Sequence, residues 1–584
     1  MGFAEVLEQV GSLGRFQFLH VLLLSLPIFM MASHNLLQNF VALVPPHHCR
    51  APPPPSPSPA PAPLDLLPAL LPFDPQGRPE RCRRYAQPQW HLLDWNQSQS
   101  LQYWTGAGAS PQNQSLQYWT GAGASPQNES QAELQGCGDG WEYQNSERSS
   151  TVISEWDLVC EHRSLKQMGQ TIYMGGVLVG STVFGGLSDR FGRRVLLLWS
   201  HLQMAVAGTC AAFSPSFPWF CFFRFLTGMA LSGIILNSFS LIVEWIPTRV
   251  RTIVGTGTGY CYTLGQLILA GLAYWIRDWR WLTLAVSLPF YLSFLYSWWF
   301  PESARWLVLN GKTDSAVNQL QRVARINGRA EEGKKINTET LRCSMQKEIS
   351  SLKSSYSPLD LVRTPALRRI TCCLIFVWFS TSFAYYGLSM DLQKFGVDIY
   401  MIQVIFGAVD IPAKLVSNMV MSLAGRRVTQ SGSLILSGVT ILTNIFIPHD
   451  FQKVRTAVAV FGKGCLASSF MCCYLYSGEL YPTLIRQNGM GLVSTMARLG
   501  AMVAPLVLLT GEFVSFLPML IYGGAPMISG VIAVFLPETL NVPLPDTIEE
   551  VELRVCGPSA AEEPPKTEEA SLGEVNHSLL KETL

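Results

Sequence analysis

The sequence predicts an all-α polytopic membrane protein with twelve transmembrane helices in two six-helix halves. Three observations predict this fold class. Only 14% of the 584 residues are charged, whereas an average soluble protein carries about a quarter. The apolar residues gather into twelve stretches, and each is close to the roughly 20 residues that cross a bilayer as a helix. Three charged motifs also recur at a nearly constant offset along the chain.

The first predicted helix covers residues 16–44, contains no Asp, Glu, Lys or Arg, and follows a polar segment at 1–15. A secretory signal has a shorter apolar core, so we expect this helix to stay in the mature protein. Five apolar stretches within 168–300 complete the first half: 168–187, 195–213, 217–243, 253–276 and 281–300. Six more within 370–535 form the second half: 370–390, 400–423, 431–447, 457–481, 490–509 and 516–535.

Basic residues in the connecting segments predict the orientation, because Lys and Arg stay on the cytoplasmic side. They occur at 190–194, 249–251 and 426–427, which the predicted spans place on one side. Segment 301–369, with 13 basic and 7 acidic residues, lies on that side as well. We therefore expect a plasma membrane protein with both termini in the cytoplasm, including the acidic tail at 536–584.

Residues 45–167 form one long loop on the extracellular side. The loop carries Asn-x-Ser sequons at Asn96, Asn113 and Asn128, which we expect to be glycosylated. A proline-rich stretch at 51–63 and a 15-residue segment repeated over 99–128 predict no packed core.

Four cysteines of the loop face an oxidising compartment, where disulfides persist: Cys49, Cys82, Cys137 and Cys160. We expect two bridges, and the sequence leaves their three connectivities open. The spacings match no zinc motif, so we expect no metal site.

Several classes of function are not favoured by the sequence. A net charge of +1 gives no basic field for nucleic acid. The sequence lacks the Gly-x-Ser-x-Gly, P-loop and His-Glu-x-x-His motifs, so neither an enzyme nor ATP-driven transport is predicted. We expect no cofactor.

An internal duplication relates the two halves. The segment from Glu244 to Arg251 recurs from Glu479 to Arg486 at an offset of 235. Gly-Arg-Arg at 192–194 recurs at 425–427, and Pro-Glu-Ser at 301–303 corresponds to Pro-Glu-Thr at 537–539. Two parallel six-helix halves are typical of carriers that rock around a site at the bilayer midplane.

The segment 185–194, Gly-Gly-Leu-Ser-Asp-Arg-Phe-Gly-Arg-Arg, resembles the signature of the major facilitator superfamily. The resemblance implies the major facilitator fold, with ion pairs and helix-end charges that change as the halves rock. The expected gating or structural residues are Asp189, Arg190, Arg193, Arg194, Glu244, Arg251, Asp410, Glu479 and Arg486.

Four further segments, at 1–11, 151–160, 301–306 and 383–387, are similar to the organic ion transporters of that superfamily, solute carrier family 22. The resemblance covers nearly the whole chain except the proline-rich and repeated parts of the loop and the acidic tail. Within the family, the chain most resembles the organic anion transporters.

Charged residues within the predicted spans are informative, because each costs about 2.5–3.5 kcal/mol on insertion scales. Asp410 and Lys414 lie four residues apart on the eighth predicted helix, within reach of each other. Either they form an internal ion pair, or Lys414 offers a substrate its positive charge. Arg224 and Lys463 lie nearer outer helix ends, and we expect them to reach the membrane interface.

Arg498 lies inside the eleventh predicted helix with no acidic residue one turn away. Either Glu479 or Asp410 pairs with it across helices, or it faces a water-filled cavity where its planar fork binds a carboxylate or sulfonate. The set of Asp410, Lys414 and Arg498 contains one acid and two bases, which favours an anion.

The resemblance to the anion carriers agrees with this charge balance, because their residue at the position of Arg498 is basic, whereas the cation carriers have an acid there. Lys414 also matches a lysine of the anion carriers. The positions that match the family's cavity lining are Tyr262, Trp378, Tyr385, Tyr386, Phe470 and Tyr474, with Asn35 on the first helix as a further candidate.

The resemblance implies a polyspecific carrier of small organic anions, embedded in membrane lipid, that exchanges them for an intracellular dicarboxylate such as 2-oxoglutarate or glutarate. The alternatives are an organic cation or carnitine carrier and a narrow-substrate carrier of the urate type. The oligomeric state stays open.

Overall fold

The computed structural model describes residues 3–50 except 12, 67–89 except 74–76, 133–144, 150–345, and 360–556 except 391, 396, 449, 483, 484, 543 and 546. The three predicted glycosylation sites, the proline-rich stretch, the tandem repeat and residues 557–584 lie outside this part of the chain.

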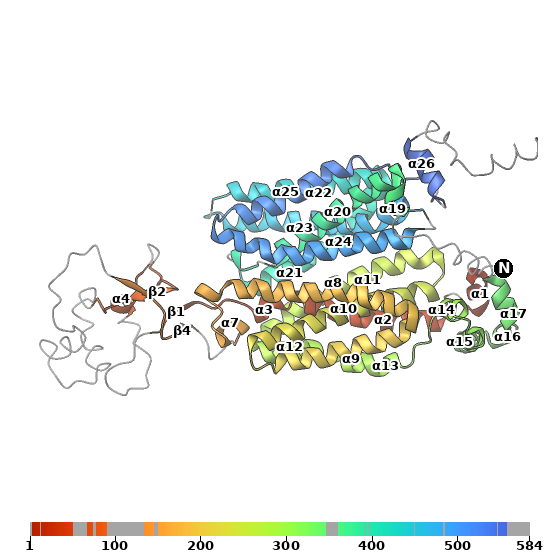
Figure 1. Cartoon of the computed structure of the whole chain (residues 1–584), viewed down its shortest axis with the longest axis horizontal. Helices are drawn as coiled ribbons and strands as arrows, with labels where there is room; N and C mark the ends of the chain where they lie inside the picture. Colours follow the sequence, from red (N-terminus) through yellow and green to blue (C-terminus); the bar gives the residue numbers. More distant parts are fainter. Residues whose placement is uncertain are drawn as a thin grey trace, which may run out of the picture.

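The first half consists of helices at the six predicted spans (Figure 1). Their bounds are α2 (Arg15–Leu36) with α3 (Gln38–Val41), α8 (Ser164–Phe191), α9 (Arg193–Ala212), α10 (Phe217–Trp245), α11 (Thr248–Trp275), and α12 (Trp279–Ser287) with α13 (Pro289–Ser297). The sixth span is broken because Pro289 has no N–H to continue the hydrogen-bond ladder of α12.

The second half repeats this order. Its helices are α20 (Pro365–Ser389), α21 (Ile399–Ala424), α22 (Arg426–Phe446), α23 (Gln452–Leu480), α24 (Arg486–Val507) and α25 (Leu517–Ala533). Short 3-10 turns, η5 (Leu392–Phe395) and η6 (Leu508–Glu512), precede α21 and follow α24.

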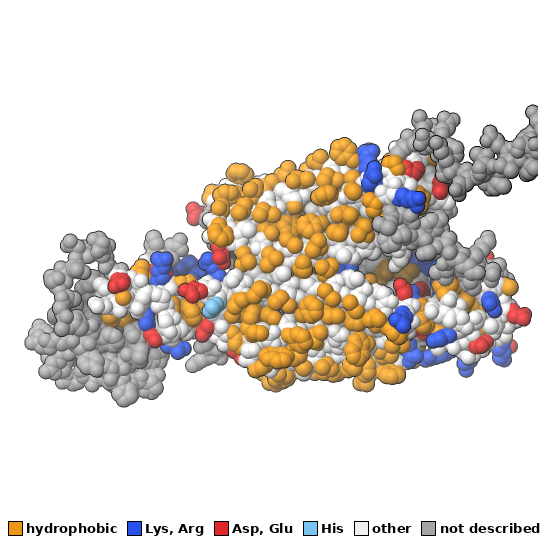
Figure 2. Space-filling model, in the orientation of Figure 1, with side chains coloured by type: hydrophobic (Ala, Val, Ile, Leu, Met, Phe, Trp, Pro, Cys, Tyr) orange, Lys and Arg blue, Asp and Glu red, His pale blue; other side chains and the backbone are white. Residues whose placement is uncertain are grey.

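Eight helices of the described residues are long and apolar enough to cross a membrane, and α25 is a shorter apolar helix. On the face that Figure 2 shows, apolar side chains cover both halves, whereas charged side chains gather at the two ends. The twelve predicted spans all coincide with a helix or a broken helix. The count of twelve crossings itself stays a prediction.

The long loop forms a small domain at one end of the bundle (Figure 1). Its strands pair antiparallel, β1 (His47–Cys49) with β4 (Trp141–Tyr143) and β2 (Arg83–Tyr85) with β3 (Leu134–Gly136). Its described helices are α4 (Leu67–Leu70), α7 (Val152–Glu155) and η4 (Cys160–His162). Of the three connectivities, the structure has Cys49–Cys137 and Cys82–Cys160.

The opposite end carries the described N-terminal helix, the connection between the halves and the last described helix (Figure 1). These elements are α1 (Phe3–Val10), α14 (Ala304–Leu309), α15 (Thr313–Ile326), α16 (Ala330–Lys334), α17 (Thr338–Ser344), α19 (Asp360–Arg363) and α26 (Ile548–Cys556). Asn327 ties α1 to this end, because its amide donates to Val10 O (3.1 Å) and Gly11 O (3.0 Å). We call this end the inner end and the end with the loop domain the outer end.

The duplicated motifs form the same arrangement twice at the inner end. Glu302 accepts from the backbone N–H groups of Arg193 (3.0 Å) and Arg194 (3.0 Å) at the start of α9. Glu538 accepts from those of Arg426 (2.8 Å) and Arg427 (3.0 Å) at the start of α22. The recurrence of these caps confirms that the two halves are structural repeats.

Candidate functional site

The seam between the two halves is closed at the outer end. The halves meet where α8 packs on α24 and α11 packs on α21. Polar contacts join them near the loop domain, among them Asn39 Nδ2 to Ser389 O (2.8 Å), Gln393 Nε2 to Val44 O (3.2 Å) and Arg163 Nε to Glu512 Oε1 (2.6 Å). The seam is therefore tied on the side of the disulfide-bonded loop.

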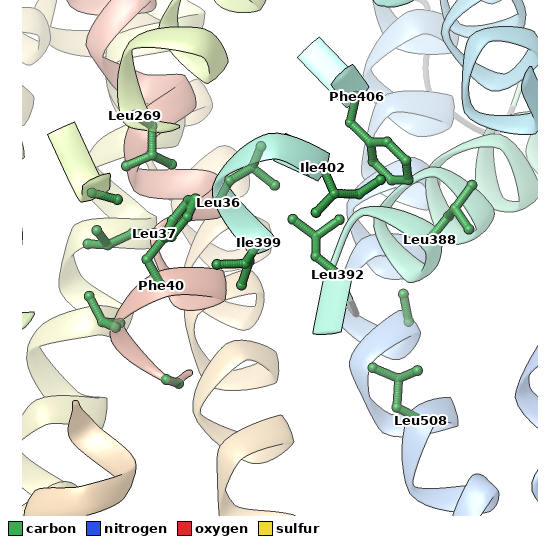
Figure 3. Close-up of a cluster of buried hydrophobic side chains, with 14 of the residues drawn as sticks. Leu36, Leu37, Phe40, Leu269, Leu388, Leu392, Ile399, Ile402, Phe406 and Leu508 are labelled. Carbon is green, nitrogen blue, oxygen red and sulfur yellow. The ribbon is translucent and has the colours of Figure 1, made fainter. Parts of the chain in front are cut away.

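A cluster of buried apolar side chains seals the same end (Figure 3). Leu37 and Phe40 come from the first half, and Ile402 and Phe406 come from the second half; each is at most 6% exposed. Burial of apolar surface is worth about 25 cal/mol per Å², so this cluster contributes to holding the outer end shut.

The seam opens toward the inner end. A Cβ atom added to Gly259 on α11 would lie 4.0 Å from Lys414 Nζ. A Cβ atom added to Gly255, one turn nearer the inner end, would have no described atom within 4 Å. On α8, Gly175 lies against Met502 of α24 (3.7 Å). Gly186, three turns farther inward, again has no described atom within 4 Å. The described residues therefore have the contacts of an inward-open carrier.

The opening reaches the predicted substrate residues. Tyr474 on α23 is 56% exposed, and Gly478, one turn closer to the inner end, has no described atom within 4 Å of its Cβ position. Gly491 is equally open and lies two turns from Arg498 on α24. Tyr474 and Arg498 interact by charge, and we call the region next to these two side chains, on the side of the inner end, the inner vestibule.

Arg498 has no carboxylate within 4 Å among the described residues. Its Nη1 donates to Ser494 Oγ (2.9 Å) on its own helix, and its charge acts on the phenols of Tyr386 and Tyr474. Both acidic partners considered from the sequence are engaged elsewhere. Asp410 pairs with Lys463, and Glu479 accepts from Arg426 Nε and Nη2 (both 3.1 Å).

Of the two readings of Asp410 and Lys414, the internal ion pair between them is not formed. Asp410 Oδ1 lies 2.7 Å from Lys463 Nζ, which also donates to Phe406 O (2.7 Å). Lys463 was expected near an outer helix end, but α23 begins at Gln452. Lys463 is therefore eleven residues into the helix, or about 16 Å, and only 1% exposed.

The expectation that Arg224 reaches the membrane interface is also wrong. Its side chain is 1% exposed and turned inward. Its Nη2 donates to His34 O (3.2 Å), and its guanidinium lies over the ring of Tyr173 (4.1 Å to the centroid).

Lys414 forms no ion pair with a described residue and instead crosses the seam. Its Nζ donates to Gly259 O (2.9 Å) and Thr263 Oγ1 (2.8 Å), both on α11 of the other half. With Lys463 included, the central residues are three bases and one acid. Asp410 is in contact with Lys463 and acts on Lys414 only by charge, so neither Lys414 nor Arg498 forms an ion pair with a described residue.

The predicted aromatic residues of the second half lie together. Tyr385 OH donates to Asp410 Oδ2 (3.2 Å), and its ring packs edge-on against Tyr386 (5.5 Å) and Phe470 (5.2 Å). Trp378 is 1% exposed and forms a wall behind Tyr474, with ring centroids 4.6 Å apart.

The predicted residues of the first half form a hydrogen-bonded chain. Asn35 Nδ2 donates to Tyr262 OH (3.1 Å), and Tyr173 OH donates to Asn35 Oδ1 (2.9 Å). Gln266 links the halves, because its Nε2 donates to Tyr385 OH (3.2 Å). Asn35 and Tyr262 are therefore placed across the seam from the aromatic cluster.

The predicted gating residues at the inner end contact their own half. Arg193 Nη2 lies 3.0 Å from Asp189 Oδ1, and its Nε lies 3.7 Å from Glu244 Oε1. Arg194 Nη2 donates to Trp298 O (2.7 Å), and Arg486 Nε donates to Tyr481 O (3.2 Å). Arg190 lies over the Phe191 ring (5.4 Å to the centroid), and the charges of Arg251 and Glu244 attract each other. None of these contacts joins the two halves.

Comparison with known proteins identifies the family. The family described as "Sugar (and other) transporter" matches residues 99–551. Solute carrier family 22 member 6 of Danio rerio is 61% identical over 584 residues, which is 100% of both chains. Organic anion transporter 3 of Pongo abelii is 49% identical over 571 residues, 98% of this chain and 97% of the other. The chain belongs to solute carrier family 22.

The fold of this family 22 chain is that of the major facilitator superfamily. An inward-open structure of the xylose transporter XylE from E. coli aligns with a TM-score of 0.53 at 19% identity, covering 68% of this chain and 91% of that chain. Its partially occluded inward-open structure aligns with a TM-score of 0.53 at 18% identity, covering 65% and 89%.

Three residues of the site in this family 22 member were missed from the sequence: Lys463, Gln266 and Tyr173. Each acts across helices, through contacts to Asp410, Tyr385 and Asn35 respectively. Spacing along one helix carries no signal for such pairs. If the predicted span had begun at Gln452, as α23 does, Lys463 would have been expected well inside the membrane rather than near its surface.

Proposed function

We propose that this protein carries small organic anions across the plasma membrane by alternating access. The observation that carries the proposal is Arg498, a base at the inner vestibule with no carboxylate partner among the described residues. A planar guanidinium donates two parallel hydrogen bonds to a carboxylate or sulfonate. One relative of the chain is named organic anion transporter 3.

The rest of an amphipathic anion has apolar surroundings next to Arg498. Tyr474, Tyr386 and Phe470 offer aromatic faces and edges, and ligand sites combine such walls with a few polar groups. The two bases without an ion pair among the described residues disfavour an organic cation or carnitine as substrate. A polyspecific carrier needs aromatic side chains that fit substrates of many shapes. A narrow-substrate carrier of the urate type needs a fit to one shape.

Exchange for an intracellular dicarboxylate follows from the same charges. Closing the vestibule without a ligand would bury Lys414 and Arg498 without an anionic partner, and an unpaired buried charge costs several kcal/mol. A bound anion removes this cost, so the loaded carrier changes state more readily than the empty one. A dicarboxylate such as 2-oxoglutarate or glutarate matches two bases.

The inner end is the cytoplasmic end in this proposal. The opposite end carries both disulfides, which persist in an oxidising, extracellular compartment. The described N-terminal helix and the described parts of the basic 301–369 segment lie together at the inner end (Figure 1), as the positive-inside rule requires.

Uptake of labelled para-aminohippurate, with and without glutarate preloaded inside the cells, tests this function. We expect saturable uptake that internal glutarate stimulates. Uptake without such stimulation would refute exchange but keep anion transport. No uptake by protein detected at the cell surface, together with uptake of a labelled organic cation, would refute the assignment of anions.

A further inference from the structure

Exposed arginines lie beside apolar surface at the inner end of the second half. Figure 2 shows Lys and Arg side chains next to apolar side chains there. Arg369 in the first turns of α20 and Arg427 at the start of α22 are both exposed. Neither guanidinium forms an ion pair or a side-chain hydrogen bond with a described residue. Both charges are therefore available to a partner from outside the described chain.

Arg369 continues the lipid-facing side of α20. Arg369, Cys372 and Phe376 follow at i, i+3 and i+7, so they share one helix face. Cys372 is exposed, and Phe376 is 55% exposed within a predicted span. Arg369 is seven residues closer to the inner end than Phe376, or about 10 Å. On this face, apolar surface therefore gives way to positive charge at Arg369.

Helix α25 lies between α20 and α22. On one side, Ser529 Oγ donates to Phe376 O (3.1 Å) of α20. On the other side, a Cβ atom added to Gly530 would lie 3.1 Å from Ser431 O of α22. Arg427 is one turn closer to the inner end than Ser431. The two exposed arginines therefore flank the inner end of α25.

The outer face of α25 is an apolar strip that ends at the level of these arginines. Its exposed side chains are Ile528 (63%), Val531 (55%) and, just after the helix, Phe535 (60%). Phe535 is six residues beyond Ser529, a distance along the chain close to the seven residues between Phe376 and Arg369. Apolar surface and basic groups are therefore arranged in the order of lipid chains and headgroups.

Charge interactions independently place both arginines near the same turn. Arg369 acts on Cys373, and both Cys373 and Arg427 act on the buried Tyr476. Tyr476 OH donates to Pro537 O (2.7 Å) in the turn that follows α25. The arginines therefore approach the end of α25 from its two neighbouring helices.

The first half uses the equivalent arginine differently. Arg194 and Arg427 are the last residues of the duplicated Gly-Arg-Arg motif. Arg194 Nη2 donates to Trp298 O (2.7 Å), directly after α13, whereas the guanidinium of Arg427 has no such acceptor among the described residues. The open arginine is therefore specific to the second half.

We propose that Arg369 and Arg427 bind the headgroups of anionic phospholipids in the cytoplasmic leaflet, with the acyl chains along the apolar strip of α25. A guanidinium donates paired hydrogen bonds to phosphate oxygens, and anionic lipids attract basic residues at this membrane surface. Inorganic phosphate offers the same oxygens without acyl chains, so it would leave the strip unoccupied. The lipid lies on the outer face of the second half, so its binding does not depend on which substrate is carried.

The test compares melting temperatures of the purified full chain in detergent with added dioleoyl phosphatidylglycerol or dioleoyl phosphatidylcholine. Bound ligand stabilises the folded state by mass action. We expect phosphatidylglycerol to raise the melting temperature of the wild type by roughly 2 °C more than phosphatidylcholine does. The difference should disappear in Arg369→Gln/Arg427→Gln.

Arg325→Gln/Arg342→Gln is the matched control, because it removes two exposed arginines from α15 and α17 and changes the net charge equally. We expect it to keep the effect of phosphatidylglycerol. Equal losses in both double variants, or no difference between the lipids in the wild type, would overturn the proposal. An equal rise with inorganic phosphate alone would show a simple ion site and also overturn it.

Cross-linking of the wild type keeps the proposal testable if Arg369→Gln/Arg427→Gln does not fold. Phosphatidylglycerol with a photoreactive group on its acyl chain should label peptides from residues 517–536 more than peptides from 289–298, the equivalent helix end of the first half. Equal labelling of the two regions would show that the lipid has no preference for α25 and would contradict the site.

Discussion

Two bases within helices of the second half have opposite surroundings. Lys463 is neutralised by Asp410 at 2.7 Å, whereas Arg498 has only Ser494 and neighbouring phenols. A paired base is a structural element, because its charge is already satisfied. An unpaired base at an opening is available to a ligand, and this difference is the basis of our proposal that Arg498 binds the substrate.

We expect Arg498→Gln to lower kcat/KM for para-aminohippurate uptake by about 10- to 100-fold, because a hydrogen bond to a charged group is worth about 1.5–3 kcal/mol. Arg498→Lys keeps the charge without the planar fork, so it should retain part of the activity. Uptake is normalised to protein at the cell surface. Equal kcat/KM in Arg498→Gln and wild type would remove Arg498 from the binding site.

We expect Lys463→Met and Asp410→Leu each to destabilise the protein by about 3–5 kcal/mol, because each leaves a buried charge unpaired. The double variant should recover most of the lost thermal stability. Lys414→Met is the matched control, since Lys414 bonds to neutral groups on α11. If Asp410→Leu rescued Lys414→Met rather than Lys463→Met, the observed pairing would be incorrect.

The residues of the site differ in how far the sequence revealed them. Lys414 and Arg498 were identified because a charge within an apolar stretch is visible along one chain segment. Lys463 was misplaced because its role depends on where α23 begins and on a partner 53 positions away. The sequence also left open whether Arg498 pairs with an acidic residue, because the answer depends on which side chains the neighbouring helices place next to it.

At the scale of helices, each half uses one glutamate to start a helix after a glycine. Gly192 and Gly425 have φ angles of 100° and 94°, which side chains other than glycine rarely adopt. Glu302 and Glu538 then accept from the first N–H groups of α9 and α22. A carboxylate at a helix N-terminus is favoured by both the free N–H groups and the helix dipole.

The two capping carboxyl groups differ in pKa. Burial raises the pKa of Glu302, and its backbone hydrogen bonds offset this only in part. For Glu538 burial also acts to raise the pKa, but four backbone hydrogen bonds together hold it below its usual value. The ionised form is therefore stabilised by folding at Glu538 and disfavoured by folding at Glu302.

We accordingly expect Glu538→Gln to lower thermal stability at pH 7 more than Glu302→Gln does. The loss in Glu538→Gln should be about 0.5–1 kcal/mol, the value of one charge at a helix N-terminus. The contribution of Glu538 is present above its unfolded pKa and is lost as the pH falls through its lower folded pKa. The melting temperatures of both variants across acidic and neutral pH measure this. An equal loss for both would contradict the difference in pKa.

The helices themselves were predicted to within a few residues, because their apolar length is a property of the local sequence. The break in the sixth span at Pro289 and the four short strands were not predicted. The strands exist because distant segments are held together, in part by the disulfides. Such pairing leaves no periodic signal in residues 45–167.

At the scale of the whole molecule, the described residues are tied at the outer end and separated at the inner end. We expect Gly478→Cys to react quickly with an impermeant maleimide applied to the inner face in inside-out vesicles, because its Cβ position is open. Bound glutarate should slow the reaction. Labelling is measured after Cys343 and Cys372, which are exposed, have been replaced by serine.

Gly175→Cys is the control for this labelling, since its Cβ position lies 3.7 Å from Met502 in the closed part of the seam. We expect it to react slowly from the same face. Faster labelling of Gly175→Cys than of Gly478→Cys would contradict an inward-open resting state. The duplicated motifs predicted two equivalent halves, but no sequence pattern specifies which end of the seam is closed.

The pairing of β2 with β3 has a consequence for how the loop domain tolerates changes in length. Tyr85 and Leu134 are opposite each other in this pair, so the chain between them leaves and returns at one place. Both copies of the repeated 15-residue segment lie in that interval, and the entropic cost of closing a loop grows only slowly with its length. Deletion of one copy, or insertion of an epitope tag between the two, should therefore leave the transmembrane helices in place and provide a handle on the extracellular face.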